Sequence, residues 1–199
     1  EDAHGGNIAI GRQALFAQNA GADAYNIAIG YNAGVSVTTG THNTLIGGLA
    51  GDALTTGSAN IAIGYEALST EDGHSQNVAI GYQALKTLNA GTAGLNVAVG
   101  HQAGVSVSTG THNTLIGGLA GDALTTGSGN VALGYRSLSS ENAHGKNTAV
   151  GYDSLRDLDA GADAYNVAVG YEAGKVISTG THNTLIGGLC GDAITTGDE

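Results

Sequence analysis

The sequence has no proline, methionine or tryptophan, and only one phenylalanine and one cysteine among its 199 residues. This composition is far from that of an ordinary globular domain, whose core mixes large apolar side chains. The apolar residues are mostly Ala, Ile, Val and Leu, so we expect a thin, closely packed core. The lone Cys190 cannot form an intrachain disulfide, and we interpret it as a small buried residue because Ala50 and Ala120 stand at the same place in the repeat.

Charged residues are also scarce, at 12% of the chain, and acidic residues outnumber basic ones by 17 to 6. That charge density is too low for a disordered acidic tail. The net charge of −11 repels phosphate backbones and anionic lipids, so we expect neither nucleic acid nor a membrane surface as a partner. No apolar run approaches the roughly 18 to 20 residues that cross a bilayer, and we predict no membrane insertion by this segment.

What the chain does contain is one motif, Asn-x-Ala-Ile-Gly and its variants, repeated eleven times. Successive motifs are 17 or 19 residues apart, and the pattern of four coils closes every 70 residues. A fixed short period is typical of a solenoid, in which each coil contacts its neighbours. We therefore predict a single repeat domain over residues 1–199. Because the opening EDAHGG matches residues 71–76 and 141–146, we expect it to be a piece of a longer fibre.

The predicted fold class is all-β, a parallel β-solenoid of about eleven coils. Within a motif, Val97 and Val99 alternate with Ala98, which is the period of a strand. We expect the β-branched pair to face the core and the third-place residue to face outward. A second short strand is expected through the following Ala-Leu or Ala-Gly step, and each coil then holds two strands and two turns.

The recurring asparagine is predicted to be structural, because stacked Asn side chains can hydrogen-bond along a ladder and also hold a turn. The predicted ladder consists of Asn7, Asn26, Asn43, Asn60, Asn77, Asn96, Asn113, Asn130, Asn147, Asn166 and Asn183.

Three coils differ from the others in the size of two residues. They carry Leu45, Leu115 or Leu185 at the third place, and a glycine, such as Gly48, where most coils have tyrosine. We interpret the exchange as size compensation on a packed face that points away from the coil's own core. A packed outward face predicts another chain, and we expect a closed homotrimer that also covers exposed strand edges.

The runs NIAIGYNA, NVAVGHQA and NTAVGYDS resemble the head repeats of YadA-type trimeric autotransporter adhesins. They are also similar to the NTAVGYxAL repeats of phage tail fibres and of bacterial surface proteins with an endosialidase-type chaperone. The resemblance covers essentially the whole chain, although adhesin head coils are usually shorter. It implies a trimeric, left-handed parallel β-roll that is extracellular, on a bacterial surface or a virion tail fibre.

Seven histidines raise the question of a metal site. His42, His112 and His182 share one place in the repeat, and copies on a threefold axis could form a site. A second set is His4, His74 and His144. Because we find no second ligand type at a fixed spacing beside either set, we predict no metal and keep the first set as the weak alternative. The acids Asp52, Asp122 and Asp192 are interpreted as turn residues, and His101, at a tyrosine place, as packing.

No catalytic constellation recurs in the sequence. We find no Ser-His-Asp or Cys-His set and no pair of carboxylates in a distinct context, and no P-loop lysine follows the glycines. The chain is therefore predicted not to be an enzyme and to need no cofactor.

We expect instead a structural and adhesive role, in attachment to a host-surface protein or glycan. Loops on a rigid scaffold often carry recognition, and the three longer turns lie at residues 20–25, 90–95 and 160–165. The candidate ligand-binding residues are Asp23, Tyr25, Asp163 and Tyr165, and several weak copies would add avidity. Two alternatives stay open: a spacer without ligand, and an ice-binding solenoid, since Thr pairs begin at Thr38, Thr55, Thr125 and Thr195.

Overall fold

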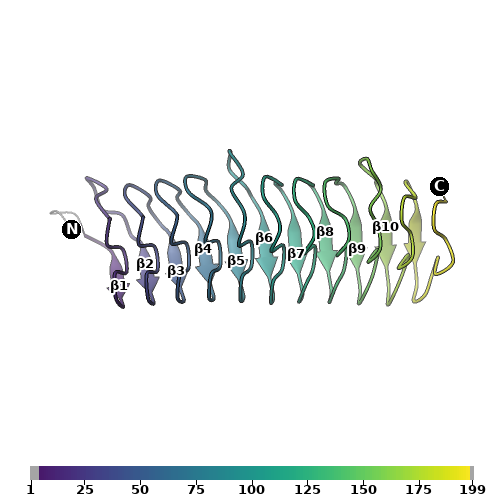
Figure 1. Cartoon of the computed structure of the whole chain (residues 1–199), viewed down its shortest axis with the longest axis horizontal. Helices are drawn as coiled ribbons and strands as arrows, with labels where there is room; N and C mark the ends of the chain where they lie inside the picture. Colours follow the sequence, from purple (N-terminus) through teal and green to yellow (C-terminus); the bar gives the residue numbers. More distant parts are fainter. Residues whose placement is uncertain (1–4, 198–199) are drawn as a thin grey trace.

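The computed structural model describes residues 5–197, and these form an all-β rod with no helix (Figure 1). Every coil contributes one strand of three residues. The strands are β1 (Ile8–Ile10), β2 (Ile27–Ile29), β3 (Thr44–Ile46), β4 (Ile61–Ile63), β5 (Val78–Ile80), β6 (Val97–Val99), β7 (Thr114–Ile116), β8 (Val131–Leu133), β9 (Thr148–Val150), β10 (Val167–Val169) and β11 (Thr184–Ile186). Nothing in residues 5–197 offers an apolar helix of the length that a bilayer requires.

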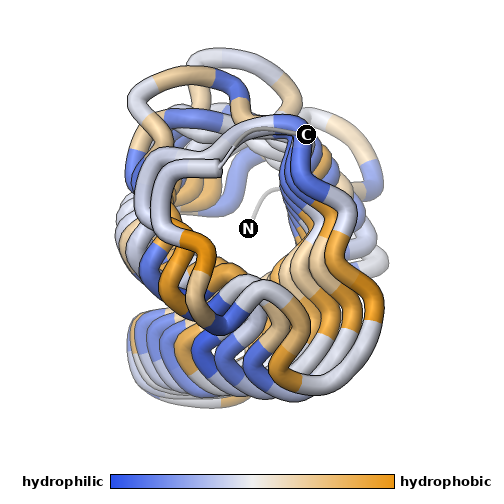
Figure 2. Tube along the Cα trace, turned by 90° about the vertical axis from the view of Figure 1, so that its right-hand side faces the viewer, coloured by the Kyte–Doolittle hydropathy of each residue, from blue (hydrophilic) through white to orange (hydrophobic). Residues whose placement is uncertain are grey.

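The eleven strands form one parallel sheet in the order of the sequence, from β1 to β11. The pairing is in register, so that Ala79 of β5 lies beside Ala98 of β6, and Leu115 of β7 lies beside Ala132 of β8. Seen along the rod, the coils superpose, with the longer turns protruding on one side (Figure 2). The predicted parallel β-solenoid of about eleven turns is confirmed.

The predicted second strand in each coil is wrong. The segments that lead to Val37, Leu54, Leu88 and Val107 are turns. In each of them, the second and the fourth residue after the glycine that ends the strand adopt left-handed backbone angles. In the fifth coil, Gln83 has φ 55° and Leu85 has φ 48°, which no strand contains. Their amides still bond between coils: Gln83 N donates to Tyr65 O at 2.9 Å and Leu85 N to Ala103 O at 3.1 Å.

The assignment of the two strand faces is also wrong. From β2 to β11 the middle residue is buried, whereas its two neighbours are half-buried or exposed. Ala98 therefore points into the coil, and Val97 and Val99 point outward. The physical reason is space: Leu85 and Leu88 also enter the narrow interior, so only a small residue fits on the strand beside them.

Size compensation exists, but inside the coil and with other partners. A methyl group at Gly34 would lie 2.6 Å from Leu45 Cδ1, and one at Gly51 would lie 2.8 Å from Leu45 Cδ2. These two glycines stand where other coils carry Leu68 or Leu85. Gly48, the partner expected from the sequence, instead lies next to the ring of Tyr65 on the outside, so pairing it with Leu45 is wrong.

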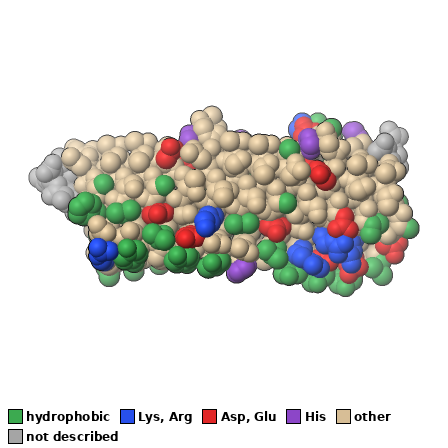
Figure 3. All heavy atoms as spheres, viewed as in Figure 1, with side chains coloured by type: hydrophobic (Ala, Val, Ile, Leu, Met, Phe, Trp, Pro, Cys, Tyr) green, Lys and Arg blue, Asp and Glu red, His purple; other side chains and the backbone are tan. Residues whose placement is uncertain are grey.

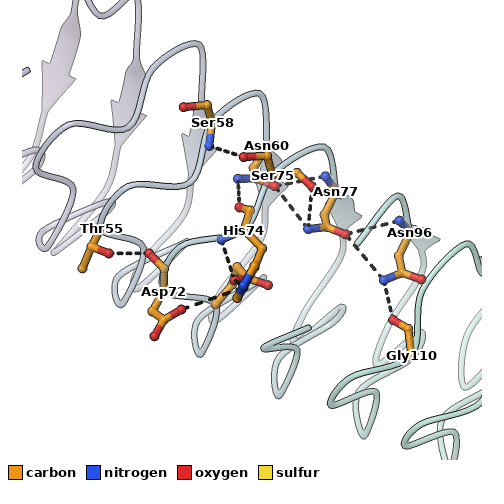
Figure 4. Close-up of polar contacts among 10 residues, drawn as sticks. Thr55, Ser58, Asn60, Asp72, His74, Ser75, Asn77, Asn96 and Gly110 are labelled. Atoms are coloured by element: carbon orange, nitrogen blue, oxygen red, sulfur yellow. Dashed lines mark hydrogen bonds and ion pairs between the residues drawn. The ribbon is translucent and has the colours of Figure 1, made fainter. Parts of the chain in front are cut away.

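The asparagine row runs the length of the solenoid and is buried from Asn26 to Asn183. Asn96 shows the pattern: its Oδ1 accepts the amide N–H of Asn113 at 2.9 Å, and its Nδ2 donates to Gly110 O at 2.9 Å (Figure 4). Asn96 N donates in turn to Asn77 Oδ1 at 3.2 Å. The Asn96 side chain thus joins its own coil to the next and closes its own turn. In the 19-residue coils, Nδ2 of Asn77 and Asn147 instead donates back to Ser75 O and Gly145 O of the preceding coil.

Candidate functional site

The outward face of the sheet is apolar along the whole rod. Places in a coil are counted from the asparagine that begins its motif. We call the residues at the second and fourth places, which are the first and last residues of the eleven strands, the outer row. Eighteen of these 22 residues are Ile, Val or Leu and four are Thr, and none is charged. Ile61 and Val131 are 37% exposed and Leu133 is 42% exposed. Apolar residues recur at one place of successive coils in Figure 2, and exposed apolar side chains line one edge of the rod in Figure 3.

A column of aromatic rings follows at the sixth place of the coils. Tyr82 stacks between Tyr65 and His101, with ring centroids 5.8 and 5.2 Å away. A second triplet consists of Tyr135, Tyr152 and Tyr171, at 5.5 and 5.4 Å. Gly118 separates the two triplets in the sequence of coils. The interpretation of His101 as a packing residue agrees with its place in the stack.

The seventh place carries hydrogen-bonded and charged groups that differ between the two halves of the rod. In the C-terminal half, Arg136 holds the buried Asp153 through Nε at 2.9 Å and Nη2 at 2.7 Å. Arg156 Nη1 lies 3.4 Å from the same carboxylate, and Figure 3 shows Lys and Arg gathered there. In the N-terminal half, Glu66 at the seventh place pairs with Lys86 at 2.6 Å, and the hydrogen bond from Lys86 lowers the pKa of Glu66.

The last long turn brings Asp163 and Tyr165 together with two residues that the sequence analysis did not assign to this patch, Lys146 and His182. Lys146 Nζ lies 2.7 Å from Asp163 Oδ2 and 2.8 Å from the Tyr165 hydroxyl, and the ammonium sits over the Tyr165 ring. The ring of His182, a weak metal candidate in the sequence analysis, stacks on Tyr165 at 5.2 Å. Hydrogen bonding to Lys146 lowers the pKa of Asp163. Tyr165 remains 47% exposed, so the turn presents a polar-aromatic patch.

The first long turn forms a simpler version of this patch. Tyr25 is 54% exposed, contacts Asp23 at 3.4 Å, and lies 5.5 Å from the ring of His42. The middle turn has Ala93 and Leu95 at the same places. The four candidate ligand-binding residues therefore form two separate patches. The middle turn lies between these patches along the chain and has neither the aspartate nor the tyrosine.

The three histidines kept as weak metal candidates do not meet other metal ligands in the described part of the chain. His42 and His182 contact the tyrosines of the long turns. His112 Nδ1 lies 3.0 Å from Thr111 Oγ1.

The other histidine set does have a second ligand type beside it, and the expectation that it has none is wrong. His74 Nδ1 lies 2.6 Å from Glu71 Oε1, and His144 Nδ1 lies 3.3 Å from Glu141 Oε1. The signal was readable in the sequence as a glutamate three residues before each histidine. His4, the third member, lies outside the described residues.

Two of the turn acids are electrostatically unusual. Asp52 Oδ1 and Asp122 Oδ1 are buried without a hydrogen-bond partner, and burial raises the pKa of both carboxyls. Asp192 belongs to the same motif in the last coil and is exposed. Cys190, which the sequence predicts to be buried, is half-buried in that coil, so this prediction is wrong.

Comparison with known proteins gives no match: no family model, no curated protein and no solved structure is similar to this chain at a significant level.

Proposed function

We propose that the chain is a structural and adhesive segment of an extracellular fibre, on a bacterial surface or a virion tail fibre, and that it mediates attachment to a host cell or surface. The observation that carries this proposal is the outer row, an uncharged apolar face that runs the length of a rigid rod. In this account the segment works by binding, without catalysis or a cofactor.

The outer row supports association with other copies of the chain. A solvated sheet face normally alternates apolar residues inside with polar ones outside, and edges carry lysine or proline against aggregation. Here all outward strand residues are Ile, Val, Leu or Thr. A repeat that continues through eleven coils gives each copy the same continuous surface, which suits a symmetric assembly. The resemblance to trimeric adhesin heads favours three chains.

The patches of the first and last long turns are the proposed contact with a host-surface protein or glycan. They combine an exposed tyrosine with a carboxylate, and the last one adds Lys146. Aromatic rings with hydrogen-bonding groups at their edge suit a sugar ring or a polar protein surface. Two patches in each chain, repeated in an oligomer, would convert weak contacts into avidity.

The test uses the middle turn as a template. The changes Asp23→Ala and Tyr25→Leu, with Asp163→Ala and Tyr165→Leu, give both outer turns the side chains of the middle one. We expect the quadruple variant to keep its melting temperature and to lose binding to host cells or to a glycan array. Equal binding by the unchanged chain and the quadruple variant would assign attachment to another surface. If neither protein binds, the chain is better explained as a spacer without ligand.

Ice binding is the weaker alternative, and the threonine pairs do not favour it. Thr55 Oγ1 donates to Asp72 O at 2.6 Å and Thr125 Oγ1 to Asn142 O at 2.7 Å, so these hydroxyls serve the coil contacts (Figure 4 shows Thr55). The outward face of the sheet has threonine at four places only. A thermal hysteresis measurement decides this alternative: we expect none.

A further inference from the structure

The twelfth place of the coils is a row of the hydrophobic core, and two coils place a glutamate in it. The row contains buried Val37, Leu54, Leu88, Val107, Leu124, Leu158 and Ile177. Glu71 and Glu141 occupy the same place, and both are 0% exposed. A buried carboxylate in an apolar row costs free energy unless a cation or hydrogen bonds compensate it.

The hydrogen bonds of Glu71 account for one of its two oxygens. Oε1 accepts the backbone N–H of His74 at 2.9 Å and faces His74 Nδ1 at 2.6 Å. Oε2 is buried and has no hydrogen-bond partner. Gln18, the other polar residue in this row, differs: its Oε1 accepts from Asn26 and its Nε2 donates to Thr38 O, so both ends are satisfied. A turn-holding role explains the amide bond of Glu71, but it leaves the second oxygen unexplained.

A third potential ligand lies beside each glutamate and histidine. Glu71, Asp72 and His74 each offer a ligand atom within 4.8 Å of the others, as do Glu141, His144 and Asp159. Figure 4 shows Asp72 and His74 pointing toward one another, with Asp72 Oδ1 3.9 Å from His74 Nδ1.

The two clusters use the same residue types with one exchange between neighbouring coils. At the thirteenth place, the first cluster has Asp72 in its own coil and Asn89 in the next, whereas the second has Asn142 in its own coil and Asp159 in the next. Asn142 Nδ2 lies 3.4 Å from Asp159 Oδ2, so these two places are adjacent in space. Each cluster therefore keeps one glutamate, one histidine and one aspartate, although the aspartate comes from a different coil.

We propose that each cluster binds a divalent transition-metal cation of the zinc type, through the glutamate, the histidine Nδ1 and the aspartate. Two ligand atoms at about 2.0–2.1 Å from a tetrahedral ion are about 3.3 Å apart. That is the 3.3 Å separation of His144 Nδ1 from Glu141 Oε1. In the first cluster, His74 Nδ1 and Glu71 Oε1 are closer, at 2.6 Å, because they share a hydrogen bond, which a bound ion would replace. An imidazole with few carboxylates suits Zn²⁺, whereas Ca²⁺ takes six to eight oxygen ligands.

The ion would compensate the buried carboxylate and lie between the core and the surface, because the glutamates are buried while His74, His144, Asp72 and Asp159 are half-buried or exposed. It would join the side chains of neighbouring coils in the second cluster. This proposal does not depend on adhesion or on the number of chains in the assembly.

The experiment measures zinc bound per chain after equilibrium dialysis in micromolar Zn²⁺, with Ca²⁺ in a parallel arm. The main variant is Glu71→Gln with Glu141→Gln, because glutamine occupies this core row at Gln18 with a hydrogen bond at both its oxygen and its nitrogen. A second variant, Glu71→Leu with Glu141→Leu, places at both positions the leucine that neighbouring coils have at the twelfth place. His74→Gln with His144→Gln is compared with a matched control, His112→Gln with His182→Gln, and circular dichroism checks that each variant folds.

We expect bound zinc to fall by two ions per chain in both glutamate variants and in the His74/His144 variant, and to stay unchanged in the His112/His182 control. The melting temperature of the unchanged chain should rise with zinc, and that of the glutamate variants should not. Three results would overturn the proposal. They are a zinc content that is equal in all variants, an unchanged chain that retains no zinc, and tighter binding of Ca²⁺ than of Zn²⁺. The residues Glu1, Asp2 and His4 repeat the motif, so we use the difference between variants and not the total.

Discussion

The two faces of the same sheet differ in a way that is clearest in β6. Ala98 is completely buried inside the coil, whereas Val97 and Val99, which are larger and more apolar, are half-exposed outside it. In a coil this narrow, side-chain size decides which strand residue enters the core, and the more hydrophobic residues of β6 remain on the outside. The inner face thus accounts for the stability of one chain, while the outer face has apolar area left for a partner.

The largest effect is expected on the buried side of the coil, at the asparagine row. Asn96→Ala removes the side-chain hydrogen bonds to the Asn113 amide and the Gly110 carbonyl, and leaves these two backbone groups unpaired. Each such group costs about 1–3 kcal/mol, so we expect a loss of about 3 kcal/mol or more in the free energy of unfolding. Urea unfolding measures it. Asn19→Ala, at an exposed place, is the control and should change stability by less than about 0.5 kcal/mol.

The contrast between the faces can be tested with two neighbouring residues of β5. Ala79→Leu forces a larger side chain into a core that already holds Leu68 and Leu85, and should cost about 1–3 kcal/mol. Val78→Leu adds one carbon on the outer row and should cost much less. Replacing Leu68 and Leu85 by glycine, the arrangement around Leu45, should recover part of the packing in the Ala79→Leu chain. Equal costs for the Ala79 and Val78 changes would contradict the orientation of the strands.

A smaller effect is expected in the aromatic column on the outside. Tyr82 stacks on both Tyr65 and His101, and such ring pairs contribute about 0.5–1.5 kcal/mol. We expect Tyr82→Ala to lower stability by about 1 kcal/mol, measured by the same urea titration. Tyr31→Ala is the comparison, because Gly48 in the next coil has no ring and Tyr31 contacts the exposed Arg12 guanidinium in place of a ring, so this change should cost less. The reverse order would show that the ring stack adds less than the Arg12 contact.

The smallest effect concerns pH and the turn acids. Burial raises the folded-state pKa of Asp52 and Asp122 above the unfolded value, so their ionisation favours the unfolded chain. The resulting destabilisation is absent below the unfolded pKa of about 3.9 and complete once the pH exceeds the folded pKa. We expect Asp52→Asn with Asp122→Asn to be more stable than the unchanged chain at pH 7 and equal to it below about pH 4. A stability difference that is the same at both pH values would contradict this cause.

The sequence predicts the coils, the strands and their register well, because Asn and Gly recur at every strand and a period of two is visible between them. The sequence does not tell which face of a strand is inside, because alternation defines two faces without showing which one is buried. Hydrophobicity alone predicts that the face with the β-branched residues is buried, and this is the face that lies outside. The missing second strand leaves no signal either, because Gln83 and Leu85 adopt left-handed angles without being glycine. The glutamates at Glu71 and Glu141 could have been found as charged residues in an otherwise apolar place of the repeat.

The central claim, that the outer row is an interface between copies of the chain, is tested most directly by sedimentation equilibrium at micromolar concentration. We predict a mass three times the 19.5 kDa of one chain. The change Ile80→Lys with Val99→Lys, on the outer row of the central coils, should return the mass to that of one chain with its circular dichroism spectrum unchanged. A mass of 19.5 kDa for the unchanged chain would contradict the account.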